Sequence, residues 1–274
     1  MSTFKLTIAY DGTGFVGWQR QAAGTSIQGL LEDALRELDG RDVAVTGAGR
    51  TDAGVHALGQ VGSVSLERAI EPAALVRAVN ARLPGAVRVL DAVEASASFH
   101  ARFEARSKTY RYRIWNGDVI SPFDRAYAWR IAAPALDVEA MASEAKLVAG
   151  RHDFAAFQAS GGDTRTTERE VFSSRLTSRR AGRPADAKSS GVGGGLEGLQ
   201  VGPGTLITYE ITGDGFLRHM VRTMVGTLIE IGRGRRPAGW LSEVMGSRDR
   251  AMAGPTAPAE GLFLVSVAYD SGIG

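Results

Sequence analysis

The chain has 274 residues, of which 44% are hydrophobic and 23% are charged, so it can form one large or two modest globular domains with a real core. It contains no cysteine, which excludes disulfides and thiolate metal sites. No apolar run approaches the roughly 20 residues needed to span a bilayer, and the N-terminal MSTFKLTIAYDG does not have the pattern of a signal peptide. We therefore expect a cytoplasmic protein with no membrane partner.

The placement of the positive charge along the chain is more informative than its amount. The formal net charge is only +2. Only four residues are lysines, so arginine supplies nearly all of the positive charge, and arginine suits phosphate binding and base stacking. Codon usage in a GC-rich genome is an alternative explanation of this bias. Between Phe99 and Trp115, however, basic and aromatic side chains are interleaved, a pattern that suits RNA.

The first hundred residues predict strands and helices in the order βαββαβ, which is typical of a ferredoxin-like unit. Thr25 and Gln28 have the spacing of a capping box ahead of the first helix, and Gly40 is its predicted end. In chain order the elements are a strand at 4–10, a helix at 27–38, strands at 43–45 and about 59–66, a helix at 72–83 and a strand from 87.

The second half of the chain repeats this order. Its predicted elements are a strand at 107–115, a helix at about 137–148, strands at about 169–177 and 204–212, helices at 217–231 and 238–246, and a strand at 261–269. We expect an α+β protein with two ferredoxin-like halves, residues 1–105 and 106–274, whose sheets could join edge to edge. Residues 178–204 are rich in Gly, Ser, Ala and Pro and predict a flexible surface insertion, with an RNA-gripping loop as the alternative.

Residues 47–57, GAGRTDAGVHA, are the candidate functional loop. Three glycines surround an Arg-Thr-Asp core and predict a tight, exposed turn. Arg50 and Asp52 could form a charge pair that keeps the carboxylate ionised. A dinucleotide fingerprint would need glycine at position 52, and a phosphate loop would need a lysine at its end, so both are disfavoured. From residue types alone, a solvated Arg–Asp pair on a glycine turn is an equal alternative.

GRTDAGVHA resembles the catalytic loop of the tRNA pseudouridine synthase A family. Six other stretches resemble the same family, in the family's order and over most of the chain. They are YDGTGFVGWQRQ at 10–21, SIQGLLEDAL at 26–35, FHARFEARSKTYRYRI at 99–114, HDFAAF at 152–157, GFLRHMVRTMVGTL at 215–228 and APAEGLFLVSVAY at 257–269.

The resemblance implies a pseudouridine synthase fold with a central mixed, mainly antiparallel sheet. It also implies a homodimer that flips a uridine out of the anticodon stem-loop of tRNA, at positions 38 to 40, and isomerises it without a cofactor. Asp52 is then the nucleophile, attacking either C1′ of the ribose or C6 of the base. The implied substrate-binding residues are Arg222 as the cation beside Asp52, Tyr110 stacked on the uracil, Arg50 bracing the flipped nucleotide, and Leu262 and Phe263 as pocket walls.

Without the resemblance, blander roles remain open for these residues. Arg222 could be a surface arginine at the edge of an apolar helix face, and Tyr110 could belong to the core of a strand. The four histidines are scattered without ligand spacing, so we expect no metal site. A non-catalytic tRNA-binding protein is the second functional class, although every residue that the chemistry needs is present. A nucleotide-binding enzyme is the third class, and it lacks both fingerprints.

Overall fold

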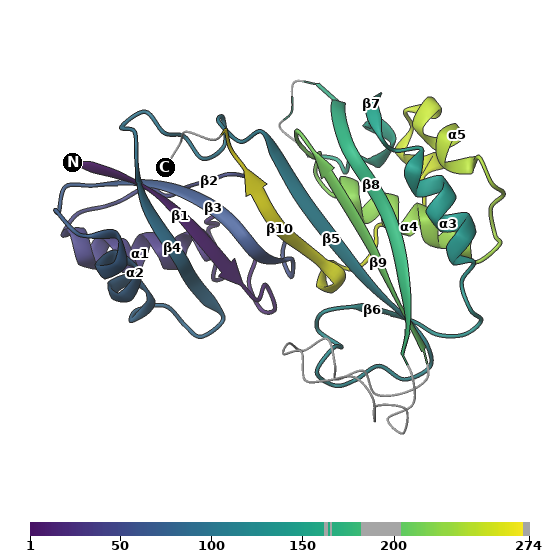
Figure 1. The fold of residues 1–274 in the computed structure, drawn as a ribbon, viewed down its shortest axis with the longest axis horizontal. Coiled ribbons are helices and arrows are strands. Elements are labelled where there is room, and N and C mark those ends of the chain that lie inside the picture. The colour runs from purple at the N-terminus through teal and green to yellow at the C-terminus, as the bar shows by residue number, and fades with distance from the viewer. Residues whose placement is uncertain (162–163, 165, 182–203, 271–274) are drawn as a thin grey trace. The chain divides into compact units, whose positions relative to one another are not determined.

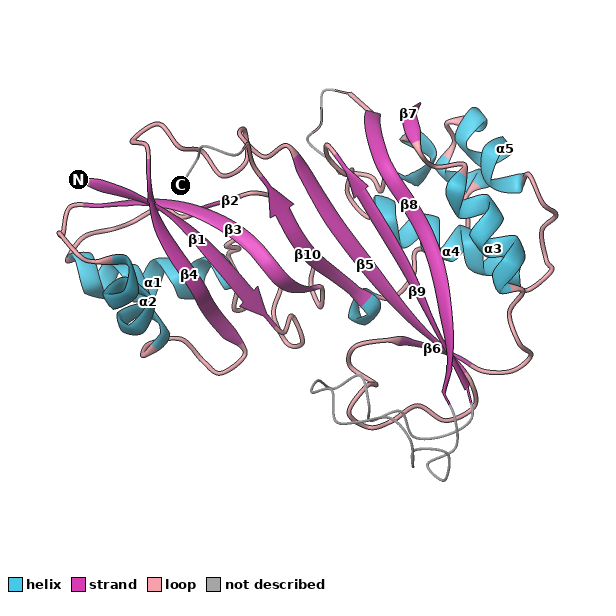
Figure 2. Ribbon diagram, viewed as in Figure 1, coloured by secondary structure: helices cyan, strands magenta, loops and turns pink. Residues whose placement is uncertain are grey.

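The computed structural model describes residues 1–161, 164, 166–181 and 204–270. In these ranges the chain forms ten strands and five α-helices (Figures 1 and 2), which confirms the predicted α+β class. The chain divides into two compact units. Unit 1 is Met1–Thr109 with Phe263–Gly274, and unit 2 is Tyr110–Leu262. The last strand, predicted as part of the second half, belongs to unit 1 over nearly all of its length.

Unit 1 is a mixed sheet with two helices on one face (Figure 1). Its strands are in the order β4-β1-β3-β10, with β2 paired to β3, and all pairs are antiparallel except β10 with β3. The strands are β1 (Ser2–Tyr10), β2 (Thr46–Gly47), β3 (His56–Leu66), β4 (Val87–Ala95) and β10 (Leu262–Ala268), and the helices are α1 (Ile27–Asp39) and α2 (Pro72–Asn80).

Helix α1 shows why this layer forms. Ile27, Leu31 and Leu35 recur at helical spacing and are fully buried, so the helix covers the sheet with one apolar stripe. Gly40 ends the helix in a left-handed conformation, as predicted. The predicted capping box is wrong, because the N-cap is Ser26, whose side chain accepts a hydrogen bond from the Gly29 N–H.

Unit 2 is also a mixed, mainly antiparallel sheet, with its helices gathered beside β8 and β9 (Figure 2). Its strands follow the order β5-β9-β8-β7, and β6 lies parallel to β5. The strands are β5 (Ser107–Asn116), β6 (Trp129–Ile131), β7 (Gly150–Asp153), β8 (Glu168–Ala181) and β9 (Gly204–Gly213), and the helices are α3 (Val138–Lys146), α4 (Met220–Gly232) and α5 (Trp240–Ser247).

Several element boundaries differ from the prediction. Strand β8 continues to Ala181, so only residues 182–203 of the predicted insertion remain, and these lie outside the described residues. Helix α4 begins at Met220 rather than 217, because His219 has a left-handed backbone with φ of 62°. The short strand predicted at 43–45 is instead Thr46–Gly47.

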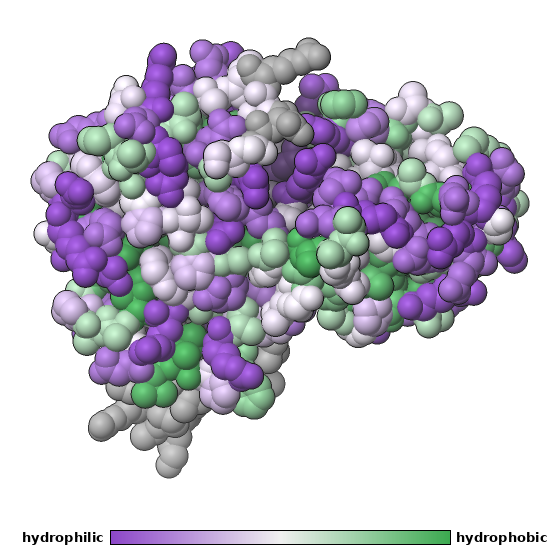
Figure 3. Space-filling view, turned by 180° about the vertical axis from the view of Figure 1, so that it is seen from behind, coloured by the Kyte–Doolittle hydropathy of each residue, from purple (hydrophilic) through white to green (hydrophobic). Residues whose placement is uncertain are grey.

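On the face shown in Figure 3, hydrophobic residues lie among hydrophilic ones. In the described ranges no helix has the length and apolarity that a membrane crossing requires.

Candidate active site

The loop that carries Asp52 is a tight turn held between β2 and β3. The Val55 N–H donates to the Asp52 carbonyl over 3.1 Å, which closes a four-residue turn. Gly54 occupies the third position of that turn with φ of 77°, a conformation that costs a residue with a Cβ about 1–2 kcal/mol. The predicted glycine turn is therefore confirmed, and it places Asp52, which is half-buried, at its first position.

The residue before Asp52 is fixed by the core of unit 1. The Thr51 hydroxyl lies 2.8 Å from the Tyr10 hydroxyl, and the Thr51 carbonyl accepts a hydrogen bond from the Trp18 N–H at 3.1 Å. Gly17 lets this segment approach, since a Cβ there would lie 2.6 Å from the Thr51 carbonyl oxygen. Neither side chain nor backbone of Thr51 can shift without breaking a buried contact, so the position of Asp52 is well defined.

A buried polar chain extends from this contact. Gln60 donates through Nε2 to the Gly49 carbonyl over 2.9 Å and reaches the Tyr10 hydroxyl at 3.4 Å. Burial raises the pKa of Tyr10 to about 12, and its hydrogen bonds to Thr51 and Gln60 oppose that rise. Tyr10 is therefore a neutral hydrogen-bonding group at physiological pH rather than a base.

His56 follows the loop and is buried under it. Its Nδ1 accepts a hydrogen bond from the Gly12 N–H at 3.0 Å and lies 3.1 Å from Asp11 Oδ1. Its ring stacks on Phe263, with centroids 4.7 Å apart and planes 26° apart. Asp11 also accepts from the Thr13 N–H and so stabilises the turn after β1. His56 thus connects the loop to the turn after β1 and to the start of β10.

Arg50 is exposed and has no ion pair among the described residues. The predicted pair between Arg50 and Asp52 is therefore wrong for this structure. The physical reason is that an ion pair at an exposed position contributes only about 0–1 kcal/mol, which does not offset the entropy of ordering a long side chain. The Arg50 guanidinium is available to a ligand.

Arg222 lies on α4 in unit 2 and is fixed against the segment 254–257. Its Nε donates to the Ala257 carbonyl over 2.7 Å, and the Ala257 N–H donates back to the Arg222 carbonyl over 3.1 Å. Close packing makes this possible, because a Cβ on Gly226 would lie 1.7 Å from the Pro255 carbonyl oxygen. The helix and the segment thus hold the root of the Arg222 side chain in one orientation.

Two tyrosines of β5 have different surroundings in unit 2. The Tyr110 ring packs edge-on against Phe216, with centroids 5.0 Å apart, and 7% of Tyr110 is exposed. Tyr112 is fully buried and donates to the Pro258 carbonyl over 2.7 Å. Burial raises the pKa of Tyr112, Glu260 adds to the rise and Arg222 opposes it. Tyr112 therefore belongs to the core of unit 2.

Leu262 and Phe263 begin β10 and point to opposite sides of the strand, as neighbours in a strand do. Leu262 is buried in unit 2, and Phe263 is half-buried in unit 1 against His56. The predicted site residues therefore divide between the units. Arg50, Asp52 and Phe263 belong to unit 1, and Tyr110, Arg222 and Leu262 belong to unit 2.

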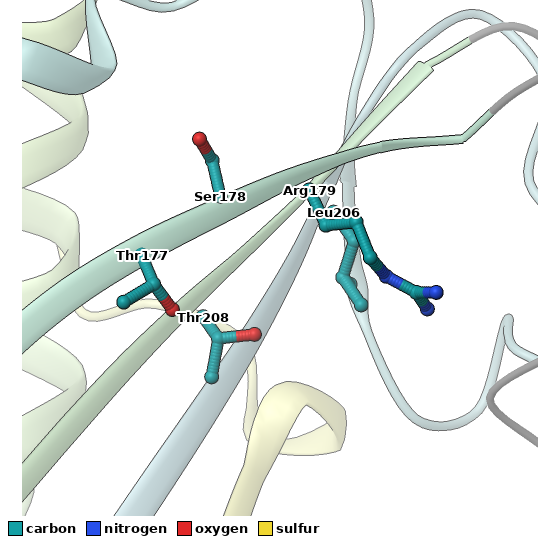
Figure 4. A pocket seen from close by; sticks show the side chains of 5 residues that line it. All are labelled: Thr177, Ser178, Arg179, Leu206 and Thr208. Carbon is teal, nitrogen blue, oxygen red and sulfur yellow. The ribbon is translucent and has the colours of Figure 1, made fainter.

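A cavity of about 220 Å³ on β8 and β9 contains none of these residues. Figure 4 shows its lining, with Arg179 and the Thr208 hydroxyl on one side of the hairpin and the Ser178 hydroxyl on the other. In the part of the chain that the structure describes, no group of three or more acidic or histidine side chains is placed to hold a metal ion.

Sequence reasoning missed the polar chain behind Asp52. Tyr10 was placed only within the predicted strand at 4–10, and Gln60 was not singled out. The available signal was Gln60 itself, a polar side chain at an inward-facing position of β3, where it is fully buried.

The fold is α+β, and a single acidic side chain lies on the glycine turn of sequence GRTDAGVH. A family model described as tRNA pseudouridine synthase matches residues 6–104 and 145–270. Tyr110 lies between these two ranges, and the other predicted site residues lie inside them.

Three relatives named tRNA pseudouridine synthase A match nearly the whole chain. The protein of Myxococcus xanthus is 43% identical over 272 residues, covering 99% of this chain and 94% of its own length. Those of Syntrophotalea carbinolica and Moorella thermoacetica are both 42% identical, cover 98% of this chain, and are covered over 97% and 100% of their own lengths. This chain belongs to the tRNA pseudouridine synthase family, an isomerase family that converts uridine to pseudouridine, which confirms the predicted family and enzyme class.

Proposed function

We propose that this chain converts uridine to pseudouridine in the anticodon stem-loop of tRNA, at positions 38 to 40, with Asp52 as the nucleophile. One observation carries the proposal most directly. Asp52 is the first residue of a tight turn, and Thr51, the residue before it, is hydrogen-bonded to Tyr10 and Trp18 in the core of unit 1, so the carboxylate is presented on a rigid support. Such a support holds a reacting group in its productive geometry.

The reaction is balanced without an added reagent. Attack of the Asp52 carboxylate, either on C1′ of the ribose or on C6 of the uracil, leads to cleavage of the C1′–N1 bond. The detached base turns, C5 bonds to C1′, and the carboxylate leaves. The C5 proton is lost and N1 gains a proton, so product and substrate are isomers. No electron donor, acceptor or group donor is consumed, which is why no cofactor is proposed.

The uridine must leave its helix to reach Asp52. Extrusion of a base costs a few kcal/mol. We assign the compensation to Tyr110, because stacking of a base on an aromatic ring contributes about 1–3 kcal/mol. Arg50, exposed and without an ion pair among the described residues, braces the flipped nucleotide or fills the space it vacates. Leu262 and Phe263 are the apolar walls that keep water from the detached base.

Arg222 is the proposed cation beside Asp52. A carboxylate loses hydration when a substrate closes over it, and a neighbouring guanidinium offsets that cost. The support for this role is the fixed root of Arg222, whose Nε is committed to the Ala257 carbonyl at 2.7 Å. A guanidinium anchored through Nε presents its remaining N–H groups in one direction.

The proposed working form is a cytoplasmic homodimer that binds tRNA. The support for tRNA as partner is family membership together with the arginine-rich composition of the chain. The dimer follows from resemblance to the family. Sedimentation of the purified protein, alone and with tRNA, measures both its oligomeric state and its binding of tRNA.

The test of the proposed function is a map of pseudouridine in a defined substrate. Purified protein is incubated with unmodified transcripts of tRNAs that carry uridine at positions 38, 39 and 40, and each position is read by chemical mapping. We expect pseudouridine at these positions and none in the acceptor stem. Product at other positions would overturn the proposed target, and the absence of any product would overturn the proposed activity.

A further inference from the structure

An exposed aromatic ring in unit 1 has no role in the site described so far. Phe103 is 76% exposed, although burial of a phenyl ring is one of the larger sources of stability in a fold. It lies in the connection between β4 and β5 (Figure 1), within the basic and aromatic stretch. We call His100, Arg102 and Phe103 the Phe103 ledge.

The ledge is rigid even though its ring is exposed. The His100 ring stacks on Phe103, with centroids 4.1 Å apart and planes 25° apart. His100 Nδ1 accepts hydrogen bonds from the backbone N–H groups of Arg102 at 3.2 Å and Phe103 at 3.3 Å. Glu104 closes the turn, since its Oε1 accepts from the His100 N–H at 2.6 Å. One face of the Phe103 ring is therefore backed by a second ring.

The ledge is attached to the same part of unit 1 as the Asp52 turn. Phe99 and Ala101 are buried together with Ala48, which lies two residues before Arg50. The Ala101 N–H donates to Ser63 Oγ at 3.2 Å, and its carbonyl accepts from the Tyr269 hydroxyl at 2.7 Å. The ledge and the segment that leads into the Asp52 turn therefore pack on the same core cluster of unit 1.

The chemistry of the ledge indicates what it binds. Arg102 is exposed, lies with its guanidinium 5.9 Å from the Phe103 ring centroid, and has no ion pair among the described residues. A backed aromatic ring beside an uncommitted guanidinium offers a base a stacking surface and offers the adjoining phosphate a cation. An apolar protein partner would pack against the Phe103 ring but would offer no group for the Arg102 guanidinium to bind.

We propose that the Phe103 ledge stacks on an unpaired base of the bound tRNA, outside the pocket that receives the target uridine, while Arg102 binds the adjoining phosphate. This inference rests on the proposed function, because it takes tRNA as the substrate. It assigns the ledge to binding and not to the chemical step. Removal of the ring should therefore weaken tRNA affinity and raise KM without lowering kcat at saturating tRNA.

The experiment measures the Kd of an unmodified tRNA transcript and the steady-state constants for four variants. Base–aromatic stacking of ordinary strength predicts that Phe103→Ala and Phe103→Leu weaken binding about 5- to 150-fold. Phe103→Trp keeps a flat ring and should stay within about threefold of the unmutated protein. The matched control is Phe172→Ala, which removes another exposed phenyl ring, 52% exposed, from unit 2 and should leave Kd within about twofold.

The outcomes separate this inference from the proposed function. If the unmutated protein makes pseudouridine but Phe103→Ala binds tRNA within twofold of it, the ledge proposal alone fails. It also fails if Phe103→Leu binds as well as Phe103→Trp, or if Phe103→Ala converts a dimer to a monomer in light scattering, which would make the ledge a contact between copies. If the unmutated protein makes no pseudouridine at all, the proposed function fails and the ledge proposal falls with it.

Discussion

The hydroxyl groups of Tyr10 and Thr51 lie 2.8 Å apart in the core of unit 1, and Thr51 directly precedes Asp52. This contact joins the end of β1 to the candidate nucleophile's turn across 41 positions of sequence. The turn is therefore supported from the core, and mutations in that support should change the rate of reaction more than they change tRNA binding.

Replacement of Tyr10 by Phe removes this contact and leaves a buried Thr51 hydroxyl without its partner. We expect a loss of about 1–2 kcal/mol in the free energy of unfolding and a several-fold fall in kcat, with tRNA affinity unchanged. The matched control is Tyr209→Phe in unit 2, which removes a buried hydrogen bond of 2.9 Å to Ser174. Denaturant unfolding should show similar losses for both variants, and kinetics should show a slower reaction for Tyr10→Phe alone.

The buried tyrosines predict a loss of stability in alkali. Burial raises the pKa of Tyr10 from 10.0 to about 12, and it also raises the pKa values of Tyr112, Tyr209 and Tyr269. Because each phenol holds its proton more tightly in the folded state, this stabilisation is complete below pH 10 and is lost as the pH rises through the folded-state pKa. The free energy of unfolding should fall by about 1 kcal/mol per pH unit for each such tyrosine above pH 10.

Urea unfolding at pH 8, 9, 10 and 11 measures this slope. Tyr10→Phe should make the fall of the free energy of unfolding with pH shallower by the contribution of one tyrosine. Equal stability at pH 8 and pH 11 would contradict the assignment of these phenols to the core.

Two glycines with the same φ allow the effect of backbone strain on stability to be separated from an effect on kcat. Gly54 in the Asp52 turn and Gly40 after α1 both have φ of 77°. Alanine at either position costs about 1–2 kcal/mol of stability, because a Cβ is disfavoured in the left-handed region. We expect Gly54→Ala also to lower kcat at least tenfold, since it displaces Asp52, and Gly40→Ala to leave kcat unchanged. Thermal unfolding measures the stability of the two variants, and turnover measures their activity. Equal activity would show that the turn does not position the reacting group.

The packing of α4 on the segment 254–257 gives a second pair of test variants, Gly226→Ala and its control Gly246→Ala. A Cβ on Gly226 would lie 1.7 Å from the Pro255 carbonyl oxygen, so Gly226→Ala must push the segment away and break both hydrogen bonds between Arg222 and Ala257. We expect a destabilisation of more than about 2 kcal/mol and a large fall in kcat at temperatures where the protein stays folded. Gly246 in α5 has open space around it, so Gly246→Ala should stabilise the protein by about 0.5–1 kcal/mol and leave kcat unchanged.

Sequence periodicity could predict most of the elements because their signals are local. The helices predicted at 27–38 and at about 137–148 are confirmed as α1 and α3, and the Asp137 side chain caps α3 by accepting from the Ala140 N–H. Strands β6 and β7 were not predicted, because each has at most four residues, too few to show alternation. Gly150 lies past the end of α3 and begins β7, with φ of 109°.

The candidate site was predictable only in part from single residues. A resemblance of nine residues is enough to indicate Asp52, but its support comes from Tyr10, Trp18 and Gln60, which are distant in sequence. Nothing local distinguishes a tyrosine that faces apolar neighbours from one that faces a buried hydroxyl. The predicted pairing of Arg50 with Asp52 failed because closeness in sequence does not determine where an exposed side chain points.

The most direct test of the account is the turnover of Asp52→Ala and Asp52→Asn on unmodified tRNA. Single-turnover pseudouridine formation and the tRNA Kd should be measured on the same preparations. We predict that both variants bind tRNA within about fivefold of the unmutated protein and form no detectable pseudouridine. Turnover by Asp52→Ala at a rate near that of the unmutated protein would contradict the assignment of Asp52 as the nucleophile.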